Sequence, residues 1–206
     1  MFTTKIIRRN FLAGAIASAS VGKVLANPSA INMDFGKFLL SGFRGTRVDD
    51  PEVIEVCDFL RRGEIAGVLL LGRNIVSPEQ LIALIEVLRA SANERNFIPI
   101  IAIDQEGGRV ARLGPENGFL EWLSASEIAN LDMSNEDILE YYTLRARQLG
   151  SVGINVNFAP VVDLNVNPNN PIIGQLDRSY SSNSDEVVRF AALFIQAHNS
   201  VSVKTC

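Results

Sequence analysis

A short stretch of the chain brings together two carboxylates, a diglycine and two arginines. It runs from Asp104 and Glu106 to Arg109 and Arg112, directly after an apolar segment at residues 98–103. The apolar segment is typical of a buried strand in a parallel sheet. In α/β folds, ligand-binding residues gather where strands end at their carboxyl side. Charges of both signs at such a point indicate a site for a polar, hydroxyl-rich ligand.

The two carboxylates do not suit a catalytic pair for glycoside hydrolysis. Retaining glycosidases place two carboxyl groups about 5 Å apart, on either side of the scissile bond. Asp104 and Glu106 are two residues apart at a strand end, so both would approach a sugar from the same side. Asp104 is better suited to accept hydrogen bonds from sugar hydroxyls, because such charge-assisted bonds are strong. The alternative is an acid that only fixes its own loop.

Four stretches resemble, in the same order, the signature sequences of glycoside hydrolase family 3, in its bacterial β-N-acetylhexosaminidase branch. They are Gly67–Asn74, Asp104–Val110, Asn157–Leu164 and Asp177–Tyr180. The resemblance runs from about residue 38 to the last residue. It implies a TIM (β/α)8 barrel and a retaining enzyme that hydrolyses terminal β-linked N-acetylglucosamine, from peptidoglycan fragments (muropeptides) or another glycan.

The resemblance also implies three substrate-binding residues. The residues at the positions of Asp104, Arg112 and Arg178 contact the sugar in the similar enzymes. For any single arginine the alternative is a solvated or ion-paired surface residue. Both arginines follow expected strand ends, where ligands bind, and we therefore predict sugar contact.

Other polar residues of the same region are predicted to have structural roles. We expect Glu106 to pair with Arg109 and shape the diglycine loop. Asp163 and Asp177 are expected to shape their own loops. His198, the only histidine, lies on an expected helix and is predicted to be a packed or surface residue rather than a catalyst.

The resemblance places the catalytic groups outside this sequence. In the similar enzymes a Lys-His pair and a Pro-Gly-His segment follow a stretch like residues 203–205, and the nucleophilic aspartate comes later still. We therefore predict no catalytic residue in this chain and expect it to be inactive by itself. Three alternatives stay open: a non-catalytic sugar-binding remnant, a β-glucosidase-type member of the same family, and a chain that does not fold because its sheet edges are open.

Alternating strands and helices must position these residues. Helix-start signals occur at Asp50, Ser77, Ser134 and Ser184. Strands are predicted at 37–42, 66–71, 98–103, 154–158 and 201–206. The asparagines of the fourth strand are expected to point to a polar interior or rim.

The helices show apolar stripes at helical spacing. The first helix is expected to end at Gly63, a typical helix stop. The residues expected on the buried faces are Val53, Val56, Cys57 and Leu60; Leu81, Leu84, Ile85 and Leu88; Leu139, Tyr142, Ala146 and Leu149; and Val188, Ala191 and Ile195.

Strand–helix alternation predicts parallel strands joined by right-handed crossovers. No Gly-x-Gly-x-x-Gly follows an early strand, which argues against a dinucleotide-binding sheet. A complete (β/α)8 barrel has about 250 residues, and this chain reaches its fifth strand only at residue 201. We therefore expect an incomplete TIM barrel of about five strands and four helices, from a truncated or interrupted version of the full enzyme.

The first 26 residues differ from the remainder of the chain. Arg8 and Arg9 precede a short, mildly apolar segment that ends in Val24-Leu25-Ala26. This pattern resembles a twin-arginine export signal, and the alternatives are an ordinary secretory signal or an uncleaved amphipathic start. We expect export by the twin-arginine translocation machinery to the periplasm or the exterior, with residues 27–206 forming the family 3 barrel domain.

Composition excludes several other functions. The formal charge is −4 and the isoelectric point is about 5.1, without the basic runs that nucleic acid binding requires. No segment is long and apolar enough for a stable membrane span. No cofactor fingerprint or metal-ligand spacing occurs. Cys57 and Cys206 are expected to be unpaired thiols in core positions, although a disulfide stays possible in an oxidising compartment.

Overall fold

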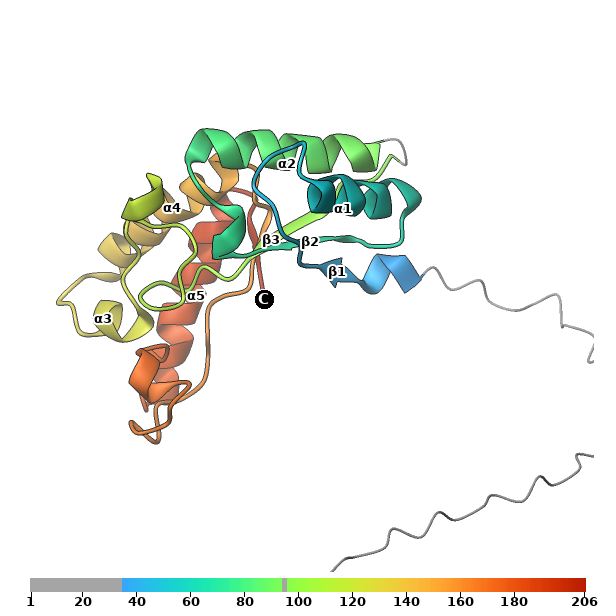
Figure 1. Ribbon diagram of the computed structural model, residues 1–206. Helices are drawn as coiled ribbons and strands as arrows, with labels where there is room; N and C mark the ends of the chain where they lie inside the picture. The colour runs from blue at the N-terminus through green and yellow to red at the C-terminus, as the bar shows by residue number, and fades with distance from the viewer. Residues whose placement is uncertain (1–34, 94–95) are drawn as a thin grey trace, which may run out of the picture. The chain divides into compact units, whose positions relative to one another are not determined.

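The computed structural model describes residues 35–93 and 96–206 (Figure 1). The predicted export signal, residues 1–26, and the domain boundary that follows it lie outside the described residues. Among the residues that are described, no helix combines the length and the apolar character needed to cross a membrane.

The centre of the fold is a five-stranded parallel sheet whose strands follow their order in the sequence. Its strands are β1 (Leu40–Ser41), β2 (Gly67–Leu70), β3 (Ile100–Ile103), β4 (Val156–Asn157) and β5 (Lys204–Thr205). Leu70 pairs with Ile103, and Ile103 pairs with Asn157, so the carboxyl ends of β2, β3 and β4 are level. The strand order never reverses, which distinguishes this sheet from doubly wound sheets, where the order reverses once.

Helices connect successive strands. The longer ones are α1 (Pro51–Arg62), α2 (Pro78–Asn93), α4 (Asn135–Ser151) and α5 (Ser184–Ser200). The short elements are α3 (Ala125–Ala129) and the 3-10 turns η1 (Phe35–Phe38), η2 (Gly72–Asn74), η3 (Pro115–Asn117) and η4 (Gly174–Leu176). Helix α1 packs beside α2, and α4 packs against α5 (Figure 1). The sequence did not predict α3 or the 3-10 turns.

Helix α1 confirms its predicted buried stripe. Val53, Val56, Cys57 and Leu60 are all at most 4% exposed. Gly63 ends the helix in the left-handed region at φ 72°, where a side chain would be strained. Asp50 lies at the N-cap, but its side chain makes no cap bond. Its carboxylate instead accepts the backbone N–H groups of Thr46 and Arg47, and so stabilises the turn before the helix.

Helix α5 is rotated relative to its predicted stripe. Val188 is 67% exposed and Ile195 is 39% exposed, so this part of the prediction is wrong. The buried face is formed by the neighbouring positions Val187, Phe190, Ala191, Phe194, Ala197 and His198. Apolar residues occupy two adjacent faces of this helix, and spacing alone does not show which face meets the sheet. A smaller difference occurs on α4, where Ile138 is buried and Leu139 is half-buried.

All five strands are shorter in the structure than the sequence predicted. Residues 37–38 belong to η1, because the chain turns before it joins the sheet. Asn157 of β4 lies in a polar interior, which is one of the two predicted settings: it is fully buried and bonds to the backbone that follows β3.

The two cysteines are free thiols in different settings. Cys57 is buried on α1 as expected, whereas Cys206 is exposed after β5 and does not occupy the predicted core position.

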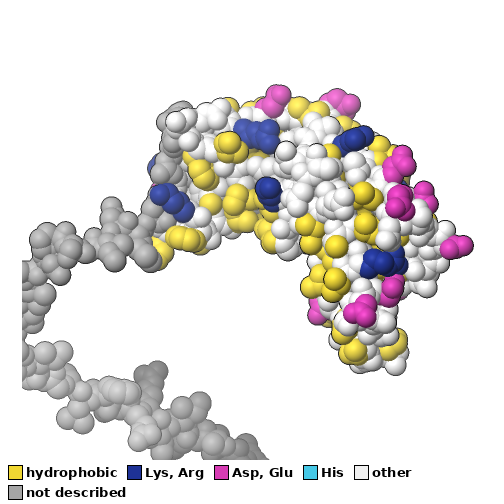
Figure 2. Space-filling view, turned by 180° about the vertical axis from the view of Figure 1, so that it is seen from behind, with side chains coloured by type: hydrophobic (Ala, Val, Ile, Leu, Met, Phe, Trp, Pro, Cys, Tyr) yellow, Lys and Arg dark blue, Asp and Glu magenta, His cyan; other side chains and the backbone are white. Residues whose placement is uncertain are grey.

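The surface mixes charged and apolar side chains. In the view from behind, hydrophobic side chains are exposed at several places between basic and acidic ones (Figure 2). Val162, Val188 and Ile195 are among the exposed apolar residues, and they line a shallow apolar groove along α5.

Candidate functional site

Asp104 follows the last residue of β3, at the carboxyl end of the sheet. Its side chain is 28% exposed and that of Arg112 is 27% exposed. Nη2 of Arg112 lies 3.3 Å from Oδ2 of Asp104. Among the described residues no group donates a hydrogen bond to Oδ1 of Asp104. The structure therefore brings two of the three predicted sugar-binding residues together and leaves one carboxylate oxygen available.

Arg178 lies against the same loop through Glu106. Its Nε and Nη2 donate to Oε2 and Oε1 of Glu106 at 2.7 and 2.8 Å, which is a bidentate pair. The Glu106 side chain is 11% exposed and that of Arg178 is 22% exposed. This hydrogen bonding raises the pKa of Arg178, and the negative charges of Asp163 and Asp104 raise it further. All three predicted site residues therefore belong to one group of charged side chains at the end of β3.

The expected pair between Glu106 and Arg109 is not formed. The diglycine makes a tight turn, with Gly107 at φ 110° and Gly108 at φ 54°. A side chain on Gly107 would collide with the carbonyl of Leu123. The turn leaves Arg109 exposed to solvent, whereas Glu106 faces the loop that carries Arg178.

Gln105 connects the two halves of this loop and was not predicted. It is fully buried, and its Oε1 accepts the backbone N–H groups of Arg112 and Leu113 at 2.7 and 3.0 Å. Its Nε2 donates to the carbonyl of Leu113 at 2.9 Å. Strand alternation does not indicate this role, because Gln105 follows the end of β3 and the last three residues of that strand are all buried.

Asn157 and His198 continue this buried polar chain. Oδ1 of Asn157 accepts the backbone N–H of Gln105, and Nδ2 donates to its carbonyl, both at 3.0 Å. Nε2 of His198 lies 3.2 Å from Nδ2 of Asn157, and Nδ1 lies 2.9 Å from the carbonyl of Phe194. Burial lowers the pKa of His198 to about 4. His198 is packed, as predicted, and it is neutral at pH 7.

The segment around Arg178 is held by neighbouring backbone and by a buried aromatic. Asp177 adopts the left-handed conformation at φ 54° and ends η4. The hydroxyl of Ser179 donates to the carbonyl of Asp163 at 2.6 Å. Tyr180 stacks on Phe190 with ring centroids 5.0 Å apart. Arg178 therefore extends from a fixed segment toward the end of β3. Asp163 and Asp177 contribute to this segment through their backbone, and a loop-shaping role of their carboxylates stays a prediction.

The arrangement can bind a polar ligand, because it presents a partly exposed carboxylate and two partly exposed guanidinium groups. Asp104 and Glu106 each face an arginine. The imidazole of His198 has both nitrogens in hydrogen bonds and no exposed surface. In the described part of the chain, no group of three or more His, Cys, Asp or Glu side chains could hold a metal ion.

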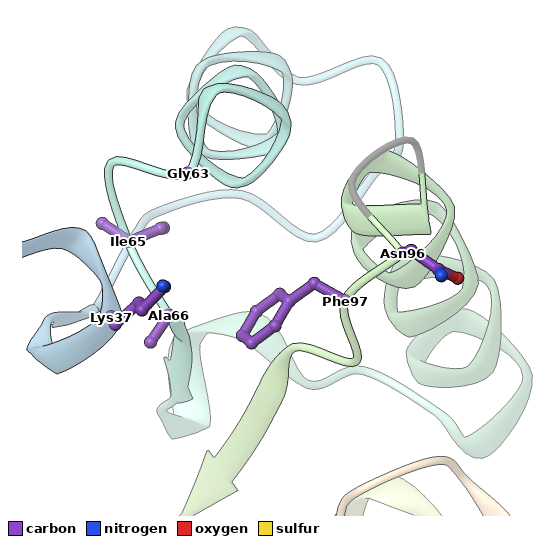
Figure 3. A pocket seen from close by; sticks show the side chains of 6 residues that line it. All are labelled: Lys37, Gly63, Ile65, Ala66, Asn96 and Phe97. Atoms are coloured by element: carbon purple, nitrogen blue, oxygen red, sulfur yellow. The ribbon is translucent and has the colours of Figure 1, made fainter. Parts of the chain in front are cut away.

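A separate cavity lies at the opposite ends of the strands. Its volume is about 240 Å³, and its lining includes Lys37, Ala66 and Phe97. The Phe97 ring extends toward Ala66 across it (Figure 3). Ala66 and Phe97 precede β2 and β3, whereas Asp104 follows β3. This cavity is therefore not part of the charged site.

Comparison with known proteins gives a consistent result. The model of the family described as "Glycosyl hydrolase family 3 N terminal domain" matches residues 48–206. Beta-hexosaminidase A of Pseudoalteromonas piscicida is 36% identical over 153 residues, which cover 72% of this chain and 25% of that protein.

Solved structures agree with this match. A family 3 beta-N-acetylglucosaminidase from Paenibacillus sp. FPU-7 is 30% identical with a TM-score of 0.71, over 84% of this chain and 31% of that one. NagZ from Neisseria gonorrhoeae, solved with N-trifluoroacetyl-D-glucosamine, is 26% identical with a TM-score of 0.69, over 82% of this chain and 48% of that one. The chain thus spans between a quarter and about half of the length of these proteins.

Proposed function

The chain belongs to glycosyl hydrolase family 3, to its N-terminal domain, and from this premise we propose that it forms the sugar-binding part of a β-N-acetylhexosaminidase site. The observation that carries the proposal is the pair of Asp104 and Arg112 at the end of β3. The carboxylate can accept hydrogen bonds from two adjacent hydroxyls, and the guanidinium can donate to a third oxygen. The bidentate pair of Arg178 with Glu106 fixes a second guanidinium beside them.

The proposed ligand is a terminal β-linked N-acetylglucosamine residue. The names of the similar proteins support this choice, since one is a beta-N-acetylglucosaminidase and another was solved with an N-acylated glucosamine. The proposed carbohydrate partner is a glycan or muropeptide that contains this sugar. The barrel architecture is proposed in the same way, because the sequential parallel strands are those of successive (β/α) units.

We further propose that these residues do not hydrolyse glycosides by themselves. The described acids of the site are paired with arginines, and the only histidine is buried with both ring nitrogens bonded. No retaining pair of carboxyl groups on opposite sides of a bond is formed by Asp104 and Glu106, which follow the same strand. Incubation with a chromogenic aryl N-acetylglucosaminide is expected to give no turnover above background, and clear turnover would refute this proposal.

Binding is tested by calorimetry with N-acetylglucosamine. We expect weak binding to the unaltered chain and none to Asp104→Ala. Asp49→Asn is the matched control, because it removes an acid from an exposed pair with Arg47 far along the sequence from the site. Equal binding by the unaltered chain and Asp104→Ala would refute the assignment. Preference for glucose over N-acetylglucosamine would favour the alternative of a β-glucosidase-type member.

Export by the twin-arginine machinery is proposed for the sequence of residues 1–26, with delivery to the periplasm or the exterior. The pair Arg8-Arg9 before a mildly apolar segment supports it. These residues, fused to a folded reporter, are expected to export it, and a double change to lysine at positions 8 and 9 is expected to stop export. Export that continues after this change would point to an ordinary secretory signal.

A further inference from the structure

The only histidine of the chain lies at the far end of a buried polar chain that leads to the charged site. His198 is fully buried near the end of α5, and its ring stacks on Phe194 with centroids 4.0 Å apart. The Trp122 ring lies 6.0 Å away. A polar side chain in such apolar surroundings is costly unless it is hydrogen-bonded, and its partners therefore show what it holds.

The hydrogen bonds of His198 determine the orientation of the Asn157 amide. The carbonyl of Phe194 can only accept, so the neutral imidazole carries its hydrogen on Nδ1 and accepts at Nε2. Nδ2 of Asn157 must then be the group that faces Nε2. A flipped amide would place Oδ1 against the lone pair of Nε2, and it would also place Nδ2 against the N–H of Gln105. The imidazole thus fixes which end of the amide meets each group.

The correctly oriented amide in turn fixes Gln105. Asn157 bonds both the N–H and the carbonyl of Gln105, as a neighbouring strand would. The covalent neighbours of Gln105 are Asp104 and Glu106, and its side chain holds the backbone N–H of Arg112. A change at Gln105 would therefore move all of the charged side chains together, including Arg178 through Glu106.

We propose that His198 is a positioning residue, which through Asn157 and Gln105 holds the loop of the charged site in register. The expected effect of His198 on sugar binding rests on the proposed function. Its effect on the loop does not depend on any ligand, because every link in the chain is a hydrogen bond within the protein.

Two substitutions separate the hydrogen bond from the ring. His198→Phe keeps an aromatic ring beside Phe194 but removes the acceptor for Asn157, whereas His198→Gln keeps an acceptor oxygen and removes the ring. Leu88→Val is the control for a general loss of stability, because Leu88 is a fully buried apolar residue of α2. All are made in the full chain.

The first readout is amide hydrogen exchange at Gln105, Arg112 and Leu113. We expect exchange at these amides to be about tenfold faster in His198→Phe than in Leu88→Val, and close to the unaltered rate in His198→Gln. Equal rates in His198→Phe and in the control would overturn the proposal. Should His198→Phe not fold, His198→Gln decides alone, because unprotected amides at these three residues in a folded His198→Gln chain would overturn it and retained protection would support it.

The second readout is calorimetry with N-acetylglucosamine. We expect the dissociation constant to rise about tenfold in His198→Phe and to stay within about twofold in His198→Gln and in the Leu88→Val control. A dissociation constant that rises equally in His198→Phe and in Leu88→Val would overturn the positioning role for binding. An unaltered chain that binds no sugar would refute the proposed function, and the exchange rates would still decide whether His198 holds the loop.

Discussion

The buried histidine makes the stability of the protein depend on pH in a defined direction. The pKa of His198 is lowered from 6.5 to about 4, because burial disfavours the charged imidazolium. The neighbours of the ring, which are Asn157, Phe194 and Trp122, carry no charge that could offset this cost. Below pH 6.5 His198 is therefore protonated in the unfolded chain, whereas it stays neutral in the folded chain until the pH approaches 4.

The size and sign of the effect follow from this difference. Stability rises with pH wherever the unfolded state holds more protons. The stability that depends on the neutral His198 is therefore fully present above about pH 6.5, falls as the pH is lowered, and stops falling below about pH 4. A displacement of about 2.5 pH units at about 1.4 kcal/mol per unit corresponds to a full loss of about 3–4 kcal/mol, of which about 3 kcal/mol is reached at pH 4.

Urea unfolding of the unaltered chain and of His198→Gln, at intervals from pH 7 to pH 4, measures this loss. The carboxylates titrate in both proteins, so their contribution cancels in the difference between the two free energies of unfolding. We expect this difference to change by about 3 kcal/mol in favour of His198→Gln toward pH 4. A difference that stays constant over the interval, or an imidazole that titrates near pH 6.5 in the folded protein, would refute the reasoning.

Two further predictions concern the charged site and the face of α5. Glu106→Gln should lower the free energy of unfolding by about 2 kcal/mol, between the values for surface and buried ion pairs, because Arg178 would lose a bidentate partner. Urea unfolding measures this loss against Asp49→Asn, a variant of an exposed ion pair whose free energy of unfolding should be unchanged, and equal values for the two variants would contradict the prediction. Val187→Ala should lower the free energy of unfolding by about 2 kcal/mol and Val188→Ala by less than about 0.5 kcal/mol, because only the Val187 side chain is buried. Thermal unfolding of the two variants checks this, and a larger loss in Val188→Ala would show that the buried face is the one predicted from the sequence.

The helices show which parts of the fold can be predicted from local sequence. On α1 the predicted apolar stripe is the buried face, although Ile54 beside it is exposed, and Pro51 and Gly63 mark the ends of the helix, so pattern and structure agree. On α5 the apolar residues continue around to Val188 and Ile195. Which of the two faces becomes buried depends on the side chains that the sheet and the neighbouring helix present to α5. This information is absent from the sequence of the helix itself.

The charged site shows a similar division. The position of Asp104 at a strand end could be predicted from a buried apolar run that stops at an acid. The partner of Glu106 could not, because Arg178 is 72 residues away and Arg109 is only three. The conformation of Gly107 and Gly108 decides between them by turning Arg109 outward. Local charge spacing therefore predicted the presence of an ion pair and selected the wrong arginine.

The sequential strand order affects how the protein can be made. Each strand pairs only with strands that are its neighbours along the chain, from β1 through β5. During synthesis, every new strand–helix unit therefore meets a surface that has already been assembled, and no earlier strand has to wait for a later one to be inserted between it and its neighbour. Such vectorial assembly keeps loop closure short. It also limits the time for which an unpaired edge is exposed on the ribosome.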